Sequence, residues 1–567
     1  MYVDEVPNRN SKPAILLRES KRRGDKVDKI TIANISHWPK EKIEALKKVL
    51  KNEDLVRRQD IFKIERSLPH GHVKAVLGTL RKIGLEQMIS SKRCAERDLV
   101  VAAIVSQILF QTSKLGSTRR RHDTTLAGEL GVEEADENDV YAAMDWLAAR
   151  QSRIEKKLAK KHLSEGGLIL YDVSSSYYEG RTCPLTRFGH SRDGKKGRPI
   201  IVYGVMTDER GCPVAVDVYP GNTADPTTVP DQVDKLRERF GLERVVLVGD
   251  RGMLTQTQID KLREHPGIGW ISALKSCAIK ELVEAEHIQP SLFDERNLAE
   301  ISSDDFPNER LVVCRNPLLG DDRKRTRDEL LDATEIELVR IQKEIAKRKK
   351  KLMSEAEIAQ KVEAHIGRYK MRKHFHIIIR RSLLLFQRNK ASIKAEEALD
   401  GIYVVRTSES EERLSSEDTV RCYKKLTDVE QLFRTLKGID IKVRPIRHRD
   451  ETRVKAHIFI CKLAYYVEWH MRRKLAALLF DDEELEQLRE ARDPVAKAEP
   501  SASARRKKKI KKTEEGFEVH SFDSLLAHLA TQCRNRCSSV IDPDAPPFFE
   551  ITDPTLLQRE VYELLDL

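Results

Sequence analysis

Two short apolar segments, each followed closely by an aspartate, constrain the fold of this chain more than any other feature. Residues 168–171 (LILY) lead directly into Asp172, and residues 245–248 (VVLV) lead through Gly249 into Asp250. Such uncharged runs are typical of strands that are buried on both faces of a parallel sheet. In sheets of this kind, the carboxyl ends of the strands carry ligand-binding and catalytic groups. We therefore expect an α/β core with an aspartate at the end of each strand.

A third carboxylate lies on a helix that we predict over residues 419–437. Its apolar residues recur at helical spacing and form a buried stripe: Leu426, Val429, Phe433 and Leu436. A neighbouring face carries a phenol, a carboxylate and two cations: Tyr423, Glu430, Arg434 and Lys437.

Each of these signals also has an ordinary structural interpretation when it is taken alone. An aspartate after a strand can be a helix cap or a turn residue, and Glu430 with Arg434 can be a solvated i, i+4 ion pair. Together, however, three carboxylates at one place repel one another unless a divalent cation neutralises them. All-oxygen ligands suit Mg²⁺ or Mn²⁺. The combination therefore favours a metal site.

The charge balance indicates a polyanionic partner. The 567 residues include 103 Lys or Arg and 91 Asp or Glu, a formal net charge of +12, and the pI is near 9.1. No apolar run of membrane-spanning length occurs, and the first residues lack the apolar core of a signal peptide. We expect a cytoplasmic protein with no membrane partner. The nine cysteines are scattered, so we interpret them as reduced thiols and not as a zinc site.

The pattern changes character along the chain and predicts five regions. Residues 1–165 are expected to be an α-helical region. Residues 166–277 and 401–475 are expected to be the two parts of an α/β core. Between them, residues 278–400 are expected to be an insertion domain with a long charged helix and β-strands. Residues 476–567 are expected to contain a flexible basic linker and a helical segment.

In these features the chain resembles the DDE transposases of bacterial insertion sequences. The order Asp172, Asp250, Glu430 matches, with 78 residues between the first two and 180 between the last two. The long second gap is similar to the branch in which a largely β insertion domain interrupts the core. That branch carries the signature Tyr-x2-Arg-x3-Glu-x6-Lys. Tyr423, Glu430 and Lys437 stand at these spacings, and Leu426 replaces the Arg.

Four further blocks are similar to segments typical of such transposases: residues 188–195, 219–225, 249–253 and 444–448. They extend the likeness over about residues 165–475. We expect them to shape the site and not to catalyse.

The resemblance implies a ribonuclease H-like core with a mixed sheet, and two Mg²⁺ ions, or Mn²⁺, held by Asp172, Asp250 and Glu430. It implies that the first region, residues 1–165, binds DNA and that the α/β core is catalytic. It also implies metal-dependent cleavage at the element ends and attack of the freed 3′-hydroxyl on target DNA. The partners would be the double-stranded element ends and the target, bound by a homodimer at the bacterial nucleoid. The resemblance implies that Tyr423 and Lys437 contact the DNA. Three further residues could contact DNA in place of the missing signature arginine: Lys424, Lys425 and Arg434.

Two other functions remain open on the sequence. A ribonuclease H-like nuclease would use the same carboxylates without strand transfer, but it needs neither the N-terminal region nor the insertion. A non-catalytic DNA-binding protein from a defective element would bind DNA through its basic segments alone. The intact carboxylates argue against this second alternative, while Leu426 keeps a defective copy open.

Overall fold

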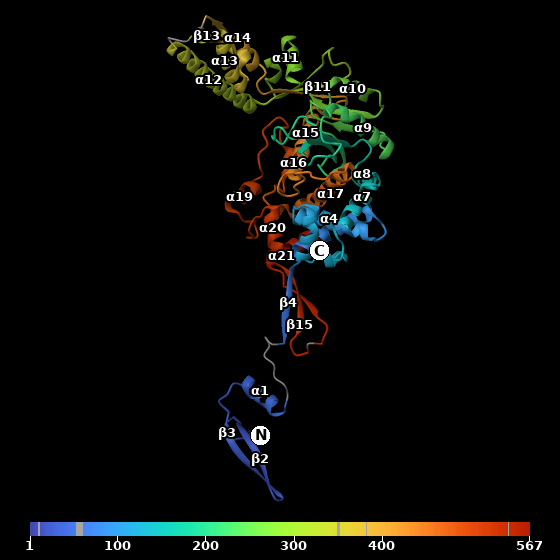
Figure 1. The fold of residues 1–567 in the computed structure, drawn as a ribbon, viewed down its shortest axis with the longest axis vertical. Coiled ribbons are helices and arrows are strands. Elements are labelled where there is room, and N and C mark those ends of the chain that lie inside the picture. Colours follow the sequence, from blue (N-terminus) through green and yellow to red (C-terminus); the bar gives the residue numbers. More distant parts are fainter. Residues whose placement is uncertain (10–11, 53–60, 349–351, 382, 543) are drawn as a thin grey trace. The chain divides into compact units, whose positions relative to one another are not determined.

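The computed structural model describes every residue except 10–11, 53–60, 349–351, 382 and 543. The described residues divide into two compact units (Figure 1). One unit comprises Met1–Leu68 and Gln532–Asp553, and the other comprises Pro69–Thr531 and Pro554–Leu567. All of the candidate site residues lie in the second, larger unit.

The smaller unit is built mainly from strands, so the expectation that residues 1–165 are helical from the start is wrong. One antiparallel sheet is formed by β1 (Tyr2–Val6), β2 (Ala14–Arg23) and β3 (Lys26–Asn34). Another contains β4 (Phe62–Pro69), β15 (Cys533–Ser539) and β16 (Phe548–Ile551). Among the described residues of this unit, α1 (Lys40–Leu50) is the one helix. β-Branched residues such as Val27, Ile30 and Ile32 favour extended backbone over helix.

Residues 71–162 of the larger unit are helical. The α-helices are α2 (Gly71–Lys82), α3 (Leu85–Ile89), α4 (Ala95–Leu109), α5 (Lys114–Arg120), α6 (Leu126–Leu130), α7 (Glu137–Ala148) and α8 (Gln151–His162). Helix α4 is apolar on every side because it is surrounded by protein, with residues 99–105 all buried. Among the described helices, none alone has the length and apolarity to cross a bilayer. Helix α4 and Lys114–Asp123 reach that length and apolarity only together, and the two are bent by 92° relative to each other.

A mixed eight-stranded sheet forms the centre of the larger unit, in the order β10-β11-β14-β9-β8-β5-β6-β7. The central strands are β5 (Leu168–Tyr177), β6 (Ile200–Asp208), β7 (Pro213–Pro220), β8 (Val245–Val248) and β9 (Ile268–Ala273). Strands β5, β6 and β7 form an antiparallel meander, whereas β8 and β9 continue from β5 in parallel. Beyond β9, the strands β14 (Ile402–Thr407), β11 (Arg310–Arg315) and β10 (Leu298–Ile301) follow in this order, each antiparallel to the strand before it.

The segment that we expected to be an insertion, residues 278–400, is shared between this sheet and a helical hairpin. Its strands β10 and β11 extend the main sheet through β14. The long charged helix is present as α12 (Pro317–Lys347), and it packs against α13 (Glu355–Tyr369) and the hairpin of β12 (Phe375–Arg380) and β13 (Leu383–Arg388). Leu331 and Leu338 of α12 belong to the separate apolar core of this hairpin. The segment is completed by α14 (Lys390–Glu397) and preceded by α11 (Ser276–Glu284).

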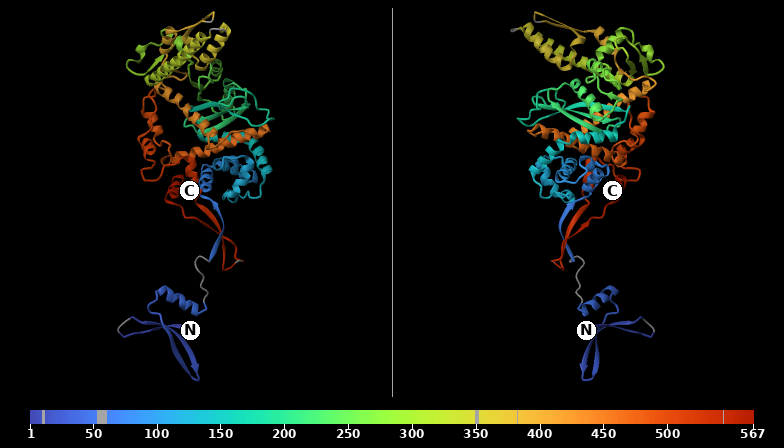
Figure 2. Two further views of the ribbon diagram at one scale, coloured as in Figure 1. Left: turned by 60° about the vertical axis from the view of Figure 1, so that its left-hand side comes forward. Right: turned by 90° about the vertical axis from the view of Figure 1, so that its right-hand side faces the viewer.

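The long helix α17 (Glu451–Leu475) joins the helical region to the sheet. It contacts α4 and α7 on one side and β7 and α16 (Leu426–Lys437) on the other. Figure 2 shows this orange helix crossing between the green sheet and the blue helices. The buried Lys462 on α17 donates a hydrogen bond of 2.7 Å from Nζ to the carbonyl oxygen of Val214. The other face of the sheet is covered by α9 (Val229–Asp234) and α10 (Gln256–Arg263).

The basic segment that we predicted to be a flexible linker contains a helix, so that prediction is wrong. Helix α19 (Ala502–Ile510) is capped by the Ser501 hydroxyl, which accepts a hydrogen bond of 2.9 Å from the N–H of Ala504. Lys507 is buried, and its Nζ donates to the carbonyls of Ala476 at 2.8 Å and Asp481 at 2.7 Å. Helices α18 (Leu485–Ala491), α20 (Phe522–Leu529) and α21 (Leu556–Leu565) complete this region.

The position of α17 gives a prediction about stability. Phe459 is fully buried in the core shared by α17, the sheet and the N-terminal helices. We expect Phe459→Ala to lower the free energy of unfolding by about 3–5 kcal/mol because it leaves a cavity. The measurement is urea denaturation followed by circular dichroism. Ile439→Ala is the control, since Ile439 is 73% exposed, and an equal loss in both variants would contradict the packing described.

Candidate metal and DNA site

The two aspartates lie on adjacent strands. Leu170 of β5 pairs with Val248 of β8 in parallel register, and Asp172 and Asp250 each lie two residues further along. Because neighbouring strands are about 4.8 Å apart, the two carboxylates start from adjacent backbone positions. The expectation that each aspartate ends a strand holds for Asp250 and is wrong for Asp172. Strand β5 continues to Tyr177 because β6 pairs with it beyond the point where β8 stops.

Asp172 is half-buried, and its environment disfavours a bare negative charge. Burial is the main cause that raises the pKa of its carboxyl to about 7, and the negative charge of Asp250 adds to the increase. The backbone N–H of Val173 donates to Oδ1 at 2.7 Å and works in the opposite direction, as does the charge of Arg192. A carboxyl in such surroundings gains most from a cation beside it.

Asp250 is exposed, but its carboxylate is held by the turn that follows β8. Its Oδ1 accepts hydrogen bonds from the backbone N–H of Gly252 at 2.9 Å and of Met253 at 2.7 Å. The free carboxylate oxygen is therefore fixed in direction by the local backbone and is available to a ligand. The short turn explains why the sequence places the aspartate two residues beyond the strand and not within it.

Glu430 is an exposed residue of α16, the helix that contacts β5. The predicted apolar stripe of this helix is buried, with Val429 and Leu436 almost fully covered. Burial of that stripe sets which face of α16 turns toward solvent, and Glu430 lies on that face. The predicted single helix over residues 419–437 is instead two helices, α15 (Ser416–Lys424) and α16, with the break at Lys425.

Tyr423, at the end of α15, is influenced by all three carboxylates. Burial raises the pKa of its phenol to about 12, and the charges of Asp250, Glu430 and Asp172 contribute to the increase. Arg251 acts in the opposite direction. The three carboxylates, which are far apart in the sequence, thus all act on the charge state of one phenol.

Lys437 lies at the other end of α16, beside a buried aspartate that we did not predict. Its Nζ is 3.2 Å from Oδ1 of Asp193, and Nη1 of Arg444 is 2.5 Å from the same oxygen. The other oxygen of Asp193 accepts a hydrogen bond of 2.9 Å from the N–H of Tyr177, at the end of β5. Burial lowers the pKa of Lys437. Asp193 therefore links two of the blocks on which the resemblance rested, residues 188–195 and 444–448.

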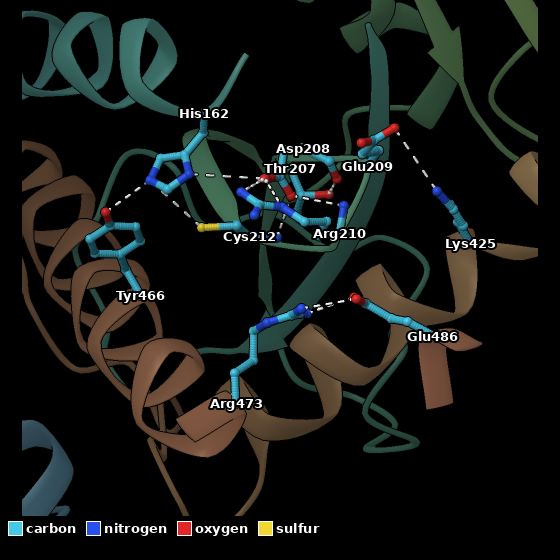
Figure 3. Close-up of polar contacts among 10 residues, drawn as sticks. All are labelled: His162, Thr207, Asp208, Glu209, Arg210, Cys212, Lys425, Tyr466, Arg473 and Glu486. Carbon is cyan, nitrogen blue, oxygen red and sulfur yellow. Dashed lines mark hydrogen bonds and ion pairs between the residues drawn. The ribbon is translucent and has the colours of Figure 1, made fainter. Parts of the chain in front are cut away.

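Of the other three predicted DNA-contacting residues, Lys424 and Lys425 are paired elsewhere, and Arg434 lies on the same helix as Glu430. Lys424 donates from Nζ to the carbonyls of Pro494 and, at 3.5 Å, Val495. Lys425 lies 4.0 Å from Glu209 in an ion pair (Figure 3). Arg434 is exposed on α16. Tyr423 and Lys437 thus adjoin the carboxylates and their supporting loops, whereas Lys424 and Lys425 are engaged elsewhere.

Arg192 and Asp225 are two site-adjacent residues that the sequence did not single out. They form an ion pair with each other, and both act on the carboxyl of Asp172, with opposite effects on its pKa. Each lies in a block that we noted for its resemblance, residues 188–195 and 219–225. The blocks therefore contain these two residues, but no spacing in the sequence identified the residues themselves.

Residues 179–467 match the family model of the transposase DDE domain, a span that covers half of the chain. The chain therefore belongs to this family of transposases, whose members generally use divalent metal ions. The match includes Asp250 and Glu430 and begins seven residues after Asp172.

Among solved structures, the chain is similar to a piggyBac transposase in a synaptic complex with hairpin DNA, determined by cryo-electron microscopy. The identity is 10%, the alignment covers 70% of this chain and 72% of that chain, and the TM-score is 0.32. A search of curated proteins found no match. The family assignment rests on the family model alone.

The carboxyl of Asp172 gives a prediction about pH. Its pKa is about 7 in the fold, against 3.8 for an ordinary aspartate, so the fold favours its protonated form. The stability that this preference contributes is present at about pH 4 and is lost as the pH rises through about 7. Asparagine has no charge at any of these pH values, so the Asp172→Asn variant does not lose this stability as the pH rises. In the presence of a chelator, we expect the melting temperature of Asp172→Asn, relative to that of the unchanged protein, to rise from about pH 5 to about pH 8.

Thermal denaturation followed by fluorescence at several pH values measures this difference. Saturating Mn²⁺ is the internal control, because a bound cation offsets the charge of Asp172 and should remove the advantage of the variant. A difference that does not change with pH would contradict the environment described for Asp172.

Proposed function

We propose that this protein is the DNA transposase of an insertion sequence, which cleaves the element ends and joins them to target DNA. The observation that carries the proposal is the match to the DDE family, in a chain whose Asp172 and Asp250 lie at the same level of adjacent strands. Glu430 acts with both aspartates on the pKa of Tyr423, which supports its place in the same site. The carboxylates also fit the metal ions that such chemistry needs. Asp172 is disfavoured as a bare anion, and Asp250 presents an oriented oxygen. These three residues would hold two Mg²⁺ ions, or Mn²⁺.

The strand arrangement supports a ribonuclease H-like core in this proposal. Such a core needs three antiparallel strands in sequence, followed by parallel strands on the far side of the first. Strands β7, β6 and β5, followed by β8 and β9, have this order and these directions. We assign the core to residues 166–277 and 401–475, and the hairpin of α12 and α13 to an insertion domain within residues 278–400. Residues 1–165 and 476–567 would be the flanking regions.

The metal ions, when bound, would activate a water or a 3′-hydroxyl and stabilise the leaving oxygen of a phosphodiester. The protein's own residues have separate tasks. Asp250 is held in place by the turn after β8, so it needs little reorganisation. Tyr423 keeps its proton at neutral pH, as tyrosines ordinarily do, and its raised pKa extends this to higher pH; it can therefore donate a hydrogen bond to the transferred DNA end. Lys437 and Arg444 share Asp193 and can release one cation toward a phosphate.

A basic cleft in the larger unit supports DNA as the partner. It lies beside the 444–449 segment and is lined by cations from the helical region and from the core: Lys114, Lys442, Arg444, Arg447, Arg449 and Arg453. Such a surface binds the phosphate backbone without reading its sequence. The segment itself is anchored to the end of β5, where the N–H of Glu179 donates to the carbonyl of Ile446 at 2.9 Å. DNA held in this cleft would thus be held by the strand that carries Asp172.

The remaining proposals follow from the family. Two element ends must be held together for transfer, so we propose a homodimer on double-stranded DNA, acting at the bacterial nucleoid in the cytoplasm. One feature keeps an alternative in view. Leu426 is only 9% exposed within the apolar stripe of α16, so it cannot replace the charge of the signature arginine. Cleavage without strand transfer, or a defective copy that only binds DNA, would both be consistent with that loss.

The decisive experiment compares the unchanged protein with Glu430→Gln on a labelled duplex from the ends of the element, with Mg²⁺ or Mn²⁺ and a supercoiled plasmid. We expect the unchanged protein to nick at one fixed position and to join that end to the plasmid. Glu430→Gln should bind the duplex equally well and lower both reactions by at least about a hundredfold, since it removes one metal ligand.

Glu412→Gln changes an exposed glutamate outside the site and should retain full activity. Nicking without joining would favour the nuclease. Metal-dependent chemistry in neither protein, with intact binding, would favour a non-catalytic protein.

The basic cleft gives a separate prediction about affinity. Lys442 and Arg449 are exposed in it, so Lys442→Gln with Arg449→Gln should weaken binding to all DNA sequences equally. The slope of log affinity against log salt should become shallower by about one for each lost phosphate contact. Fluorescence anisotropy with two unrelated duplexes measures both effects. Lys156→Gln on the exposed side of α8 is the control, and an unchanged salt slope in the double variant would rule out the cleft as the binding surface.

A further inference from the structure

Three side chains with the donor atoms of a transition-metal site meet where α8, the turn between β6 and β7, and α17 come together. They are His162, the last residue of α8, Cys212, which precedes β7, and His470 on α17. One ring nitrogen of each histidine and the sulfur of Cys212 all lie within 4.8 Å of one another. Sequence spacing could not reveal this group, because its members are about 50 and 258 residues apart along the chain.

The group is distinct from the carboxylate site. Cys212 belongs to the turn after Asp208, and Asp208 pairs with Ile169 near the beginning of β5. Asp172 lies three residues further along β5, on the way to its opposite end. A metal ion bound by one group of residues is therefore not coordinated by the other group.

Most of the group is buried, and one of its nitrogens is not hydrogen-bonded. Cys212 is fully buried and the side chain of His162 is 4% exposed, whereas His470 is half-buried. Within the part of the chain that the structure describes, Nε2 of His470 has no hydrogen-bond partner. Buried ring nitrogens are normally paired, so this lack of a partner is the second observation that points to a ligand.

The remaining contacts orient His162 as metal-bound histidines are oriented (Figure 3). Its Nε2 faces the sulfur of Cys212 at 4.0 Å and the hydroxyl of Tyr466 at 2.9 Å. Its Nδ1 faces Oδ2 of Asp208 at 3.9 Å. Histidines that bind a metal through one nitrogen usually turn the other toward a carboxylate. Asp208 is itself fixed, because its Oδ1 accepts from the N–H of Cys212 at 2.9 Å.

The protonation states agree with this orientation. Burial lowers the pKa of His162 to about 4 and that of His470 to about 3. Both imidazoles are therefore neutral at physiological pH, and a neutral imidazole has one ring nitrogen whose lone pair can bind a metal. Burial raises the pKa of the Cys212 thiol, so without a metal it keeps its proton, and a metal would displace that proton on binding.

We propose that His162, Cys212 and His470 bind one zinc ion, with the Tyr466 hydroxyl or a water as the fourth ligand. Two imidazole nitrogens and a thiolate form a donor set that suits zinc and not Mg²⁺. In tetrahedral zinc sites, neighbouring donor atoms lie roughly 3.3–3.6 Å apart, so donors that now lie within 4.8 Å of one another need to approach by up to about 1.5 Å. The half-buried His470 has the freedom to make this adjustment.

The zinc would act as a structural link. It joins the end of the helical region to the sheet and to α17, the helix buried between them. It takes no part in phosphodiester chemistry, and the inference therefore does not depend on the proposed function.

Cobalt is the probe for this site, because Co²⁺ bound to a thiolate absorbs in the near ultraviolet and Co²⁺ bound to carboxylates does not. The full chain, carrying Asp250→Asn to weaken the carboxylate site, is stripped with a chelator and titrated with Co²⁺. We expect a thiolate band and tetrahedral visible bands that saturate at one Co²⁺ per chain and disappear when one equivalent of Zn²⁺ is added. The protein purified without chelator should contain about one zinc per chain by elemental analysis.

Two variants locate the site. Cys212→Ser should abolish the thiolate band, and His470→Gln should weaken Co²⁺ binding by about 10- to 100-fold. Cys314→Ser removes another buried cysteine, on β11, and should change neither. A thiolate band that persists in Cys212→Ser, or the lack of such a band in the parent protein, would overturn the proposal. The second result would mean that Tyr466, His162 and Cys212 form only a buried hydrogen-bond network.

Melting temperatures keep the proposal testable if a variant folds poorly. Zn²⁺ should raise the melting temperature of the stripped parent protein and of Cys314→Ser, because a ligand that binds only the folded state stabilises it. No rise in the parent protein would contradict a buried zinc site, whatever the variants do.

Discussion

The parallel pairing of β5 with β8 is the constraint on which the rest of the site depends. It sets Asp172 and Asp250 at the same level of the sheet, although 78 residues separate them. The antiparallel partner β6 then extends β5 beyond β8 and exposes the flank against which α16 packs. Burial of the apolar stripe of that helix leaves Glu430 on its exposed face. Strand register thus places the two aspartates and helix packing orients Glu430, and apolar burial stabilises both.

Electrostatics opposes this arrangement in the metal-free protein. Carboxylates that are close together and partly desolvated destabilise one another. The raised pKa of Asp172 favours its protonated form, which reduces this repulsion. In the proposed site a cation would reverse the balance, so the packing that is unfavourable for the bare carboxylates would make a strong oxygen site. Asp193 shows the opposite arrangement, because one buried carboxylate is compensated by both Lys437 and Arg444. The protein therefore has carboxylates in need of cations at one end of α16 and a satisfied carboxylate at the other.

The sequence predicted the strand cores, the apolar stripe of α16 and the long charged helix α12, because each depends on a local repeat of apolar residues. It missed the break at Lys425 and the continuation of β5 past Asp172, since both are set by partners that are remote in the sequence. The strands of the smaller unit were mistaken for helix, because their residues are largely exposed and lack a strict alternation. Asp193, Arg192 and the group around Cys212 were also beyond reach. Their neighbours come from segments that only the folded chain brings together.

The smaller unit has a consequence for how the protein is made. Its strand β4, from the first part of the chain, pairs with β15, which follows more than 460 residues later. During synthesis, β4 leaves the ribosome as an unpaired edge, and it stays so until β15 has been translated. A chain cut short before Cys533 would therefore contain Asp172, Asp250 and Glu430 but lack the partner strand of β4. The unpaired β4 would mark such a truncated chain for association with other strands.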